Sequence, residues 1–327
     1  MTQFSRLRRN RKYHWLRDLL AETTLHPADF VLPFFVIEGQ NKKEKIDLIP
    51  GHFRFSIDLL IDEIQKAADI GIKAIIIFPK ITANLKDANG SEAINEKNLV
   101  CRTIAAIKKN VPEIGIISDV ALDPYTSHGH DGLVNNVGEV QNDETVEVLC
   151  KQALVQAKAG CDIVSPSDMM DGRILKIRQY LDKNGFQDIP ILSYAIKYAS
   201  NFYGAFRDAV NSGQRKPIDK KSYQMDFRNY IEAKRESKAD IAEGADMMII
   251  KPAGSYLDII AQTRANCNLP IFAYQTSGEY AMLKFGAQKE LFDFEAALFE
   301  SLIAIKRAGS EVIISYGAME IIKHLSN

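Results

Sequence analysis

Short apolar runs rich in β-branched residues recur along the whole chain, and longer stretches with helical spacing separate them. The runs are too continuously hydrophobic for a sheet with one wet face, so they predict parallel strands that are buried on both sides. Eight such runs occur: Phe30–Ile37, Ala74–Pro79, Ile114–Val120, Ile163–Ser167, Ile191–Ile196, Met247–Lys251, Ile271–Thr276 and Val312–Tyr316.

The stretches between the runs carry apolar residues at helical intervals, as in Ile57-x-x-Leu60-Ile61-x-x-Ile64. Four of them end in a glycine just before the next run, where a helix terminates in the left-handed region: Gly71, Gly160, Gly244 and Gly309. No hairpin signal stands between the strands. The α/β alternation therefore favours a (β/α)8 barrel, with a doubly wound open sheet as the alternative.

The composition is that of an ordinary globular protein, with 327 residues, 46% hydrophobic and 25% charged. One large domain or two small ones fit this length, and no break in composition marks a second domain. The net charge of −1 provides no basic field for nucleic acid or an acidic membrane surface. The longest apolar run is far shorter than the roughly 20 residues that span a bilayer. We therefore expect small-molecule partners, with no nucleic acid and no membrane.

The four cysteines are scattered without CxxC spacing, which indicates neither a disulfide framework nor a zinc ribbon. We expect a reducing compartment, the cytoplasm. The arginine-rich segment Arg6–Lys12 lacks the apolar core of a signal peptide, so it is interpreted as a basic arm before the folded domain.

Two of the predicted strands end in lysine, Lys197 and Lys251. The carboxyl ends of barrel strands form the catalytic mouth, and neighbouring strands lie about 4.8 Å apart. Repulsion and desolvation then favour the neutral amine, so the pKa of at least one lysine should fall below its usual value of about 10.4. A neutral amine can attack a carbonyl to form a Schiff base. We expect a pair of uncharged amines in one hollow; a solvated charge or a phosphate clamp is the alternative for either lysine.

Other strand ends carry polar groups whose roles the spacing leaves open. The third strand ends at Asp119 and leads into a loop with His128 and His130, which suits metal ligation or proton transfer as well as an ordinary turn. Asp168 is a helix cap or a catalytic group. Ser277 and Tyr316 offer hydroxyl donors, either to a substrate carboxylate or to structural hydrogen bonds.

The connection from Lys197 to Met247 is long, polar and basic, and long connections in compact domains are commonly lids. It includes the irregular stretch Asn211–Pro217. Its candidate binding residues are Arg207, Lys220, Lys221 and Gln224, which either bring positive charge over the mouth or form a solvated face. Two amines beneath a basic lid suit an anionic carbonyl compound.

Four segments resemble the porphobilinogen synthases, also called 5-aminolevulinate dehydratases, and the likeness covers nearly the whole chain. The segments are Pro166–Gly172, Ser193–Ala209, Ile250–Ala253 and Tyr274–Met282. The resemblance implies a (β/α)8 barrel over residues 29–327. It also implies that residues 1–28 form an arm that embraces a neighbour in a dimer, usually within a homo-octamer.

The resemblance implies condensation of two 5-aminolevulinate molecules to porphobilinogen, with loss of two waters, in tetrapyrrole (heme) biosynthesis. Lys251 matches the lysine of the P-side substrate and Lys197 that of the A-side substrate. The other matching residues are Ser277 and Tyr316 for the P-side carboxylate; Arg207, Gln224 and one of Lys220 and Lys221 for the A-side group; and Asp119 and Ser167 around the A-side amine and its proton transfers.

The metal positions depart from the zinc-dependent members of that family, which carry three cysteines where this chain has Ala121, Asp123 and Asp131. Soft sulfur selects Zn²⁺, so we expect no catalytic zinc, and no organic cofactor. Asp123 and Asp131 either bind a weakly held Mg²⁺ or K⁺ or only order water molecules. Glu236 matches a glutamate that binds an allosteric Mg²⁺, largely through water, and favours the octamer. By spacing alone it is an ordinary helix surface residue.

Two other functions compete with this interpretation. A class I aldolase-like Schiff-base lyase uses a single essential lysine and a phosphate site after the last two strands, where this chain has no glycine-rich turn. A non-catalytic oligomeric scaffold would not need to keep Lys197, Lys251, Ser277 and Tyr316, all of which are intact.

Overall fold

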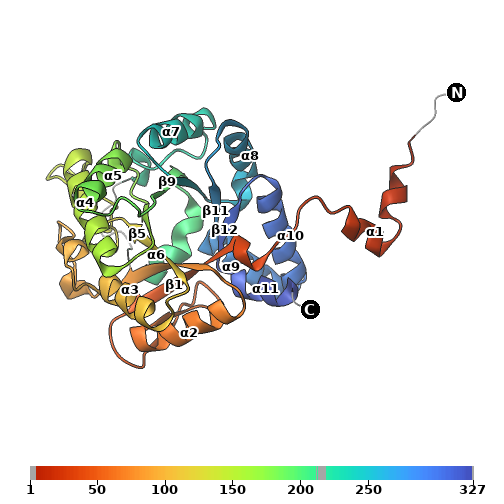
Figure 1. Ribbon diagram of the computed structural model, residues 1–327, viewed down its shortest axis with the longest axis horizontal. Coiled ribbons are helices and arrows are strands. Elements are labelled where there is room, and N and C mark those ends of the chain that lie inside the picture. Colours follow the sequence, from red (N-terminus) through yellow and green to blue (C-terminus); the bar gives the residue numbers. More distant parts are fainter. Residues whose placement is uncertain (1–4, 211, 213–218, 326–327) are drawn as a thin grey trace.

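A barrel of eight parallel strands forms the centre of the computed structural model, which describes residues 5–210, 212 and 219–325 (Figure 1). The neighbouring strands around the barrel follow the order β8-β5-β4-β1-β12-β11-β10-β9. Their bounds are β1 Phe30–Ile37, β4 Ala74–Lys80, β5 Gly115–Val120, β8 Ile163–Pro166, β9 Leu192–Lys197, β10 Met247–Lys251, β11 Ile271–Gln275 and β12 Val312–Ser315. Each strand agrees with its predicted run to within one residue at either end.

β8 and β9, the first and last strands in this order, lie next to each other and bring the sheet close to closure. A parallel bridge joins Val164 of β8 to Ile191 just before β9. The Ser165 hydroxyl adds a hydrogen bond to the carbonyl of Leu192, at 2.8 Å. The (β/α)8 barrel is therefore confirmed, and the open doubly wound sheet is wrong.

Helices cover the outside of the barrel, as Figure 1 shows. Their bounds are α2 Ile57–Asp69, α3 Leu99–Asn110, α4 Asn142–Ala159, α5 Arg173–Lys183, α7 Ile231–Ala242, α8 Leu257–Asn266, α9 Ser277–Gln288, α10 Phe294–Arg307 and α11 Ala318–Leu325. The short helix α6 (Gly204–Val210) packs instead against the side chains of the barrel interior. Short 3-10 helices occupy the connections: η2 Pro27–Asp29, η3 Ala83–Leu85, η4 Ser91–Ile94, η5 Asn201–Tyr203, η6 Lys220–Ser222 and η7 Gly254–Tyr256. The predicted helix-ending glycines 71, 160, 244 and 309 all have positive φ, between 99° and 119°.

Two small antiparallel pairs were not predicted. In the first, β2 (Lys43–Lys45) pairs with β3 (Phe53–Phe55), which also lies parallel to β1. In the second, β6 (Leu133–Val134) pairs with β7 (Val140–Gln141). These strands are two or three residues long, too short for an alternating pattern to emerge from the sequence.

The strands bury side chains on both faces, which explains their unbroken hydrophobicity. One core cluster packs between the strands and the helices. A second one fills the barrel interior, with side chains contributed by alternate strand positions. Interior members include Val31, Phe35, Ile76, Phe78, Ile117, Tyr194, Ile249, Tyr274 and Ile314.

The N-terminal segment projects away from the barrel (Figure 1). It contains η1 (Leu7–Arg11) and α1 (His14–Leu19), and neither helix has a buried residue. Residue 30 begins the first barrel strand. Over the described ranges, no helix is long and apolar enough to cross a membrane.

Candidate active site

Lys197 and Lys251 are the last residues of β9 and β10, and they lie opposite each other in the register of the two strands. Both side chains are buried and reach one small cavity at the carboxyl ends of the strands. The cavity is lined by Phe78, Asp119, Asp123, Asp131, Ser167, Lys197, Tyr203, Phe206, Arg207, Lys220, Gln224 and Lys251. The structure thus brings together the two lysines that the sequence singled out.

Aromatic rings surround the amine of Lys251. Its Nζ lies 4.6 Å from the ring centre of Tyr274, 4.9 Å from Tyr203, 5.0 Å from Phe206 and 5.4 Å from Tyr194. Burial and the nearby charge of Lys197 lower the pKa of Lys251 to about 7. A substantial fraction of this amine is therefore neutral, and nucleophilic, near neutral pH.

Lys197 has a different environment, because its amine is held by oxygen atoms. Its Nζ donates to Oδ1 of Asp131 at 3.0 Å and to the carbonyl of Ser167. Burial acts to lower the pKa of Lys197, but the negative charges of Asp131, Asp123 and Asp119 outweigh it and raise that pKa. The expectation of two uncharged amines is therefore wrong for Lys197, whose counter-ions lie far away in the sequence.

Asp131 joins the barrel to the segment above it. Its Oδ2 accepts hydrogen bonds from Lys220 Nζ at 2.7 Å and from Tyr223 Oη at 2.8 Å, while Oδ1 binds Lys197. Burial alone would raise the pKa of Asp131, but the two lysines hold it well below its usual range. Three donors already engage this carboxylate, which leaves it poorly suited to a cation.

Asp119 is placed to exchange a proton. Burial and the neighbouring Asp123 raise its pKa to about 7, against the opposing effect of the two lysines. The side chain of Ser167 hydrogen-bonds to Asp119. Burial and Asp131 also raise the pKa of Asp123. Asp119 can therefore act as an acid or a base near neutral pH.

The predicted lid residues divide between two pockets. Arg207 of α6, Lys220 of η6 and Gln224 line the cavity of the two lysines. Lys221 does not; it lines a separate pocket, and its Nζ lies 5.2 Å from the ring centre of Phe227. The expectation that Lys221 also covers the mouth is wrong, because consecutive residues of a 3-10 helix face different directions. Most of the predicted irregular stretch, residues 211 and 213–217, lies outside the described residues.

Ser277 and Tyr316 follow β11 and β12 and do not line the cavity itself. Tyr316 connects to it through Tyr274, because their hydroxyl oxygens are 3.3 Å apart and the Tyr274 ring faces Lys251. The Ser277 hydroxyl is buried and has no hydrogen-bond partner within the described part of the chain. It is a donor that a ligand can use.

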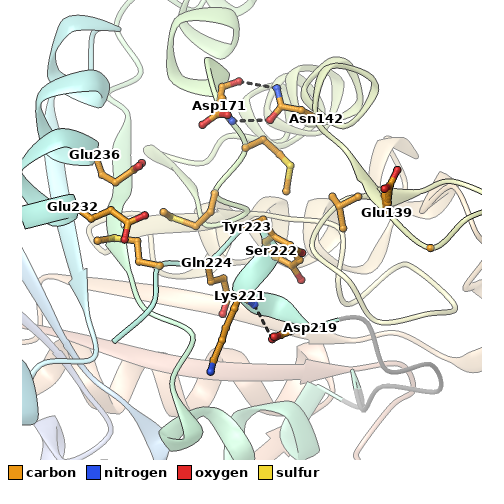
Figure 2. Close-up of a pocket in the computed structure, with 15 residues that line it drawn as sticks. Glu139, Asn142, Asp171, Asp219, Lys221, Ser222, Tyr223, Gln224, Glu232 and Glu236 are labelled. Carbon is orange, nitrogen blue, oxygen red and sulfur yellow. Dashed lines mark hydrogen bonds between the residues drawn. The ribbon is translucent and has the colours of Figure 1, made fainter. Parts of the chain in front are cut away.

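Glu236 lies in the separate pocket with Lys221, and Figure 2 shows it beside Glu232. Asn142 and Asp171 line the same pocket, where the Asn142 side chain donates a hydrogen bond to the backbone carbonyl of Asp171 and accepts one from its backbone N–H. Burial raises the pKa of Glu236, and the charges of Asp240, Asp171 and Glu232 add to the effect. The side chain is partly buried, unlike an ordinary helix surface residue.

No group of three His, Cys, Asp or Glu side chains is arranged to hold a metal ion in the part of the chain that the structure describes. Cys101, Cys150, Cys161 and Cys267 are buried free thiols, and none lines the cavity. His130 is buried, with Nδ1 3.0 Å from the hydroxyl oxygen of Tyr223. That contact gives His130 a place in the hydrogen-bond network of Asp131.

Several contacts of the site were not predicted. The aromatic rings around Lys251 come from three separate segments, and two of the rings, Tyr194 and Tyr274, lie within predicted strands. Those strands are buried on both faces, so nothing in the pattern indicates which residues face the barrel interior. Tyr223 carries no sequence signal for its contact with Asp131.

Known proteins resemble this chain over almost its full length. The family model for delta-aminolevulinic acid dehydratase matches residues 4–324. The delta-aminolevulinic acid dehydratase of Chlamydia pneumoniae is 51% identical over 99% of this chain and 97% of its own. That of Bradyrhizobium diazoefficiens is 51% identical over 96% of this chain and 88% of its own.

A solved structure has the same architecture. It is the delta-aminolevulinic acid dehydratase (porphobilinogen synthase) of Toxoplasma gondii in complex with its reaction product porphobilinogen. This crystal structure is 44% identical, covers 99% of this chain and 92% of its own, and superposes with a TM-score of 0.97. The protein therefore belongs to the delta-aminolevulinic acid dehydratase family.

Proposed function

We propose that the cavity condenses two molecules of 5-aminolevulinate to porphobilinogen, with loss of two waters, as a step of tetrapyrrole biosynthesis. The observation that carries this function is the unlike pair of lysines. Lys251 has a pKa of about 7 in an aromatic enclosure, while its register partner Lys197 is held as a charged amine by Asp131. Family membership adds the identity of the substrate.

Lys251 is the nucleophile for the first substrate. Its neutral amine attacks the ketone carbon, the carbinolamine hydroxyl takes up a proton and leaves as water, and a cationic imine forms on Nζ. The four rings around this nitrogen favour the cation through their π faces. Ser277 and Tyr316 bind the carboxylate of this substrate as hydroxyl donors.

Lys197 forms the corresponding imine with the second substrate once its proton has been removed. Asp119 is the group placed to take part in that transfer, because its pKa of about 7 lets it accept and return a proton; Ser167 hydrogen-bonds to it. Arg207, Lys220 and Gln224 bind the carboxylate of this substrate. Lys220 exchanges its contact with Asp131 for the carboxylate of the ligand.

Trapping of the imine tests this function. Incubation with 5-aminolevulinate and borohydride should inactivate the protein and add the mass of the reduced adduct to Lys251. Lys251→Ala should lose the adduct at that position and should not turn over. A colour reaction for the pyrrole product supplies an independent readout. An unlabelled protein that makes no pyrrole contradicts the assignment and favours a scaffold, and an adduct without pyrrole favours an aldolase-like lyase.

We further propose that the cavity works without catalytic zinc or an organic cofactor. Ala121, Asp123 and Asp131 stand where zinc-dependent members have cysteines, and carboxylates are poor zinc selectors. Asp131 is engaged by two lysines and a tyrosine, an arrangement that repels a cation. Stoichiometric zinc retained after dialysis, with activity lost on its removal, contradicts this proposal.

Glu236 is proposed to hold an activating Mg²⁺, largely through water. Mg²⁺ usually keeps several waters and uses one or two carboxylates, which fits a pocket that Glu236 and Glu232 line side by side. The same pocket contains Lys221 and Tyr223, while the adjacent Lys220 lines the cavity. A Mg²⁺ ion in this pocket therefore acts on the segment Lys220–Tyr223, which also contributes to the cavity of Lys197 and Lys251.

The N-terminal arm, residues 1–28, is proposed to bind a second copy and to build a homo-octamer. Its exposed side chains include Leu7, Trp15 and Leu19, at 69%, 63% and 73% exposure, which the arm's own barrel does not cover. Removal of residues 1–20 should reduce the mass of the assembly in light scattering; an unchanged mass contradicts the proposal. The four free thiols fit the cytoplasm as compartment.

A further inference from the structure

Helix α6 holds two of the side chains that define the cavity, although it is only seven residues long. Phe206 contributes a ring 5.0 Å from Lys251 Nζ, and Arg207 lines the same cavity. An isolated helix of this length is not stable in water, so its position depends on contacts with the rest of the fold.

The amino-terminal end of α6 is fixed by close packing. The preceding η5 lies against the first turn of α9, where Gly278 approaches the carbonyl of Phe202 so closely that a Cβ would collide with it. Tyr203 donates a hydrogen bond from its hydroxyl to the carbonyl of Lys251, at 3.1 Å. These contacts hold one end of α6 above the lysines.

A buried arginine contacts the other end of α6. Arg54 lies in β3, which pairs with β1, and its side chain is 9% exposed. Its Nε donates to the carbonyl of Ala209 at 2.5 Å, and its Nη2 to the carbonyl of Asp208 at 2.8 Å. These are carbonyls of the last turn of α6, which have no partner within the helix. The guanidinium thus caps the carboxyl end of α6, and its charge complements the helix dipole there.

The arginine is itself held in place by acidic groups. Its Nη1 lies 3.9 Å from Oε2 of Glu44, and its Nη2 lies 3.6 Å from Oδ2 of Asp208. Lys80, the last residue of β4, contacts the same Glu44 at 2.8 Å. A lysine at this position would carry a single ammonium group in place of the planar guanidinium. It could not donate to the carbonyls of Asp208 and Ala209 in the way that Nη2 and Nε do.

We propose that Arg54 is a positioning residue for substrate binding, which acts by capping α6 and so holding Phe206 and Arg207 over the two lysines. This inference rests on the proposed function of the cavity. Arg54 lies outside the cavity lining, so its effect passes through the helix. A displacement of reacting or binding groups by about 1 Å can cost roughly 100-fold in efficiency.

The test is a kinetic comparison of Arg54→Met and Arg54→Lys with the wild-type protein. Arg54→Met should raise the KM for 5-aminolevulinate by about 10-fold or more with a smaller fall in kcat, because ground-state binding through Arg207 is weakened. The KM of Arg54→Lys should lie between those of the wild type and Arg54→Met, because lysine retains one donor group. If Arg54→Met does not fold, the Arg54→Lys KM decides: a wild-type value overturns the proposal.

A matched control separates positioning from general destabilisation. Arg264→Met removes another arginine that binds a backbone carbonyl, that of Cys267, ahead of the amino end of β11. It should lower the melting temperature and leave KM unchanged. Equal KM changes in the two methionine variants would contradict a specific role for Arg54.

A double-mutant cycle with Arg207→Gln identifies the path of the effect. If Arg54 acts through α6, the change in log KM of the double variant should be smaller than the sum of the changes in the two single variants, Arg54→Met and Arg207→Gln. Full additivity overturns the proposal. The proposed function fails separately: a wild-type protein that makes no pyrrole refutes that function before any variant is compared.

Discussion

Lys197 and Lys251 are partners in the register of β9 and β10, yet the pKa values of their amines shift in opposite directions. Asp131 accepts a hydrogen bond from the amine of Lys197, and the nearby carboxylates raise the pKa of that amine. The same carboxylates also act on Lys251, but burial among aromatic rings and the charge of Lys197 outweigh them and lower its pKa. Identical side chains on neighbouring strands therefore start the reaction in different charge states. This difference gives each substrate molecule a distinct first step.

Lys251→Met should stabilise the protein, because it removes a buried amine whose charged form is disfavoured. The folded-state pKa of about 7 lies below the unfolded value of about 10.4. The charge therefore costs stability below about pH 7, and the cost disappears as pH rises toward 10. The gain should be about 1–4 kcal/mol near pH 6 and should shrink in alkali. Urea denaturation at several pH values measures it.

Lys197→Met is the matched control for that experiment, and its effect should have the opposite sign. The pKa of Lys197 is raised, so its stabilisation is present below the unfolded value and is lost as pH rises through the folded value. The variant should lose roughly 1–3 kcal/mol at neutral pH. Equal shifts in both variants would contradict the opposite pKa shifts of the two lysines.

Asp131→Asn should destabilise the protein strongly, because two buried ammonium groups lose their shared carboxylate. A loss of about 3–5 kcal/mol is typical when one member of a buried ion pair is removed. The pKa of Asp131 is lowered by folding, so the penalty is present above the unfolded pKa of about 3.9 and declines as pH falls below it. Denaturation at pH 7 and at about pH 2 compares the two conditions.

Asp123→Asn tests whether any buried carboxylate would have the same effect. Burial and Asp131 raise the pKa of Asp123, so its charge is disfavoured in the folded protein. Its removal should therefore leave stability unchanged or increase it. A large loss in this variant would contradict the specific role of Asp131.

The barrel could be predicted from the sequence because its strands are buried on both faces. Runs such as Phe30–Ile37 carry that signal without help from any other part of the chain. The positions of Lys197 and Lys251 followed from it, since the end of a barrel strand has a fixed place. The hairpins of β2 with β3 and of β6 with β7 lacked such a signal because their strands are two or three residues long.

The charge state of Lys197 could not be predicted from its own neighbours in sequence. Its counter-ion Asp131 follows a different strand, and which lysine it contacts depends on the path of the loop after β5. Similarly, the different orientations of Lys220 and Lys221 depend on how η6 sits over the barrel. Contacts between segments that are distant in sequence therefore determine the charge state of Lys197 and the orientations of Lys220 and Lys221.

Phe206→Leu should reduce the amount of imine on Lys251, because one of the rings that favour the cation is lost. A contact of this kind is worth about 0.5–2 kcal/mol, which corresponds to a 2- to 30-fold smaller imine population. Borohydride trapping with 5-aminolevulinate, followed by mass spectrometry of the adduct, measures it. Phe272→Leu, a change of another barrel-interior ring, should keep the wild-type population. Equal trapping in both variants would contradict the role of the aromatic enclosure.

Glu236→Gln should abolish saturable Mg²⁺ binding, because the amide has lost the charge that holds the ion. Titration calorimetry on the unliganded protein measures binding directly, and light scattering reports the mass of the assembly in parallel. Glu232→Gln should weaken binding less, because Asn229 already donates to that carboxylate at 2.7 Å. Glu96→Gln, on the surface beside Lys158, should bind as the wild type does. Undiminished binding by Glu236→Gln would place the ion elsewhere, and loss in all three variants would indicate a general effect of surface charge.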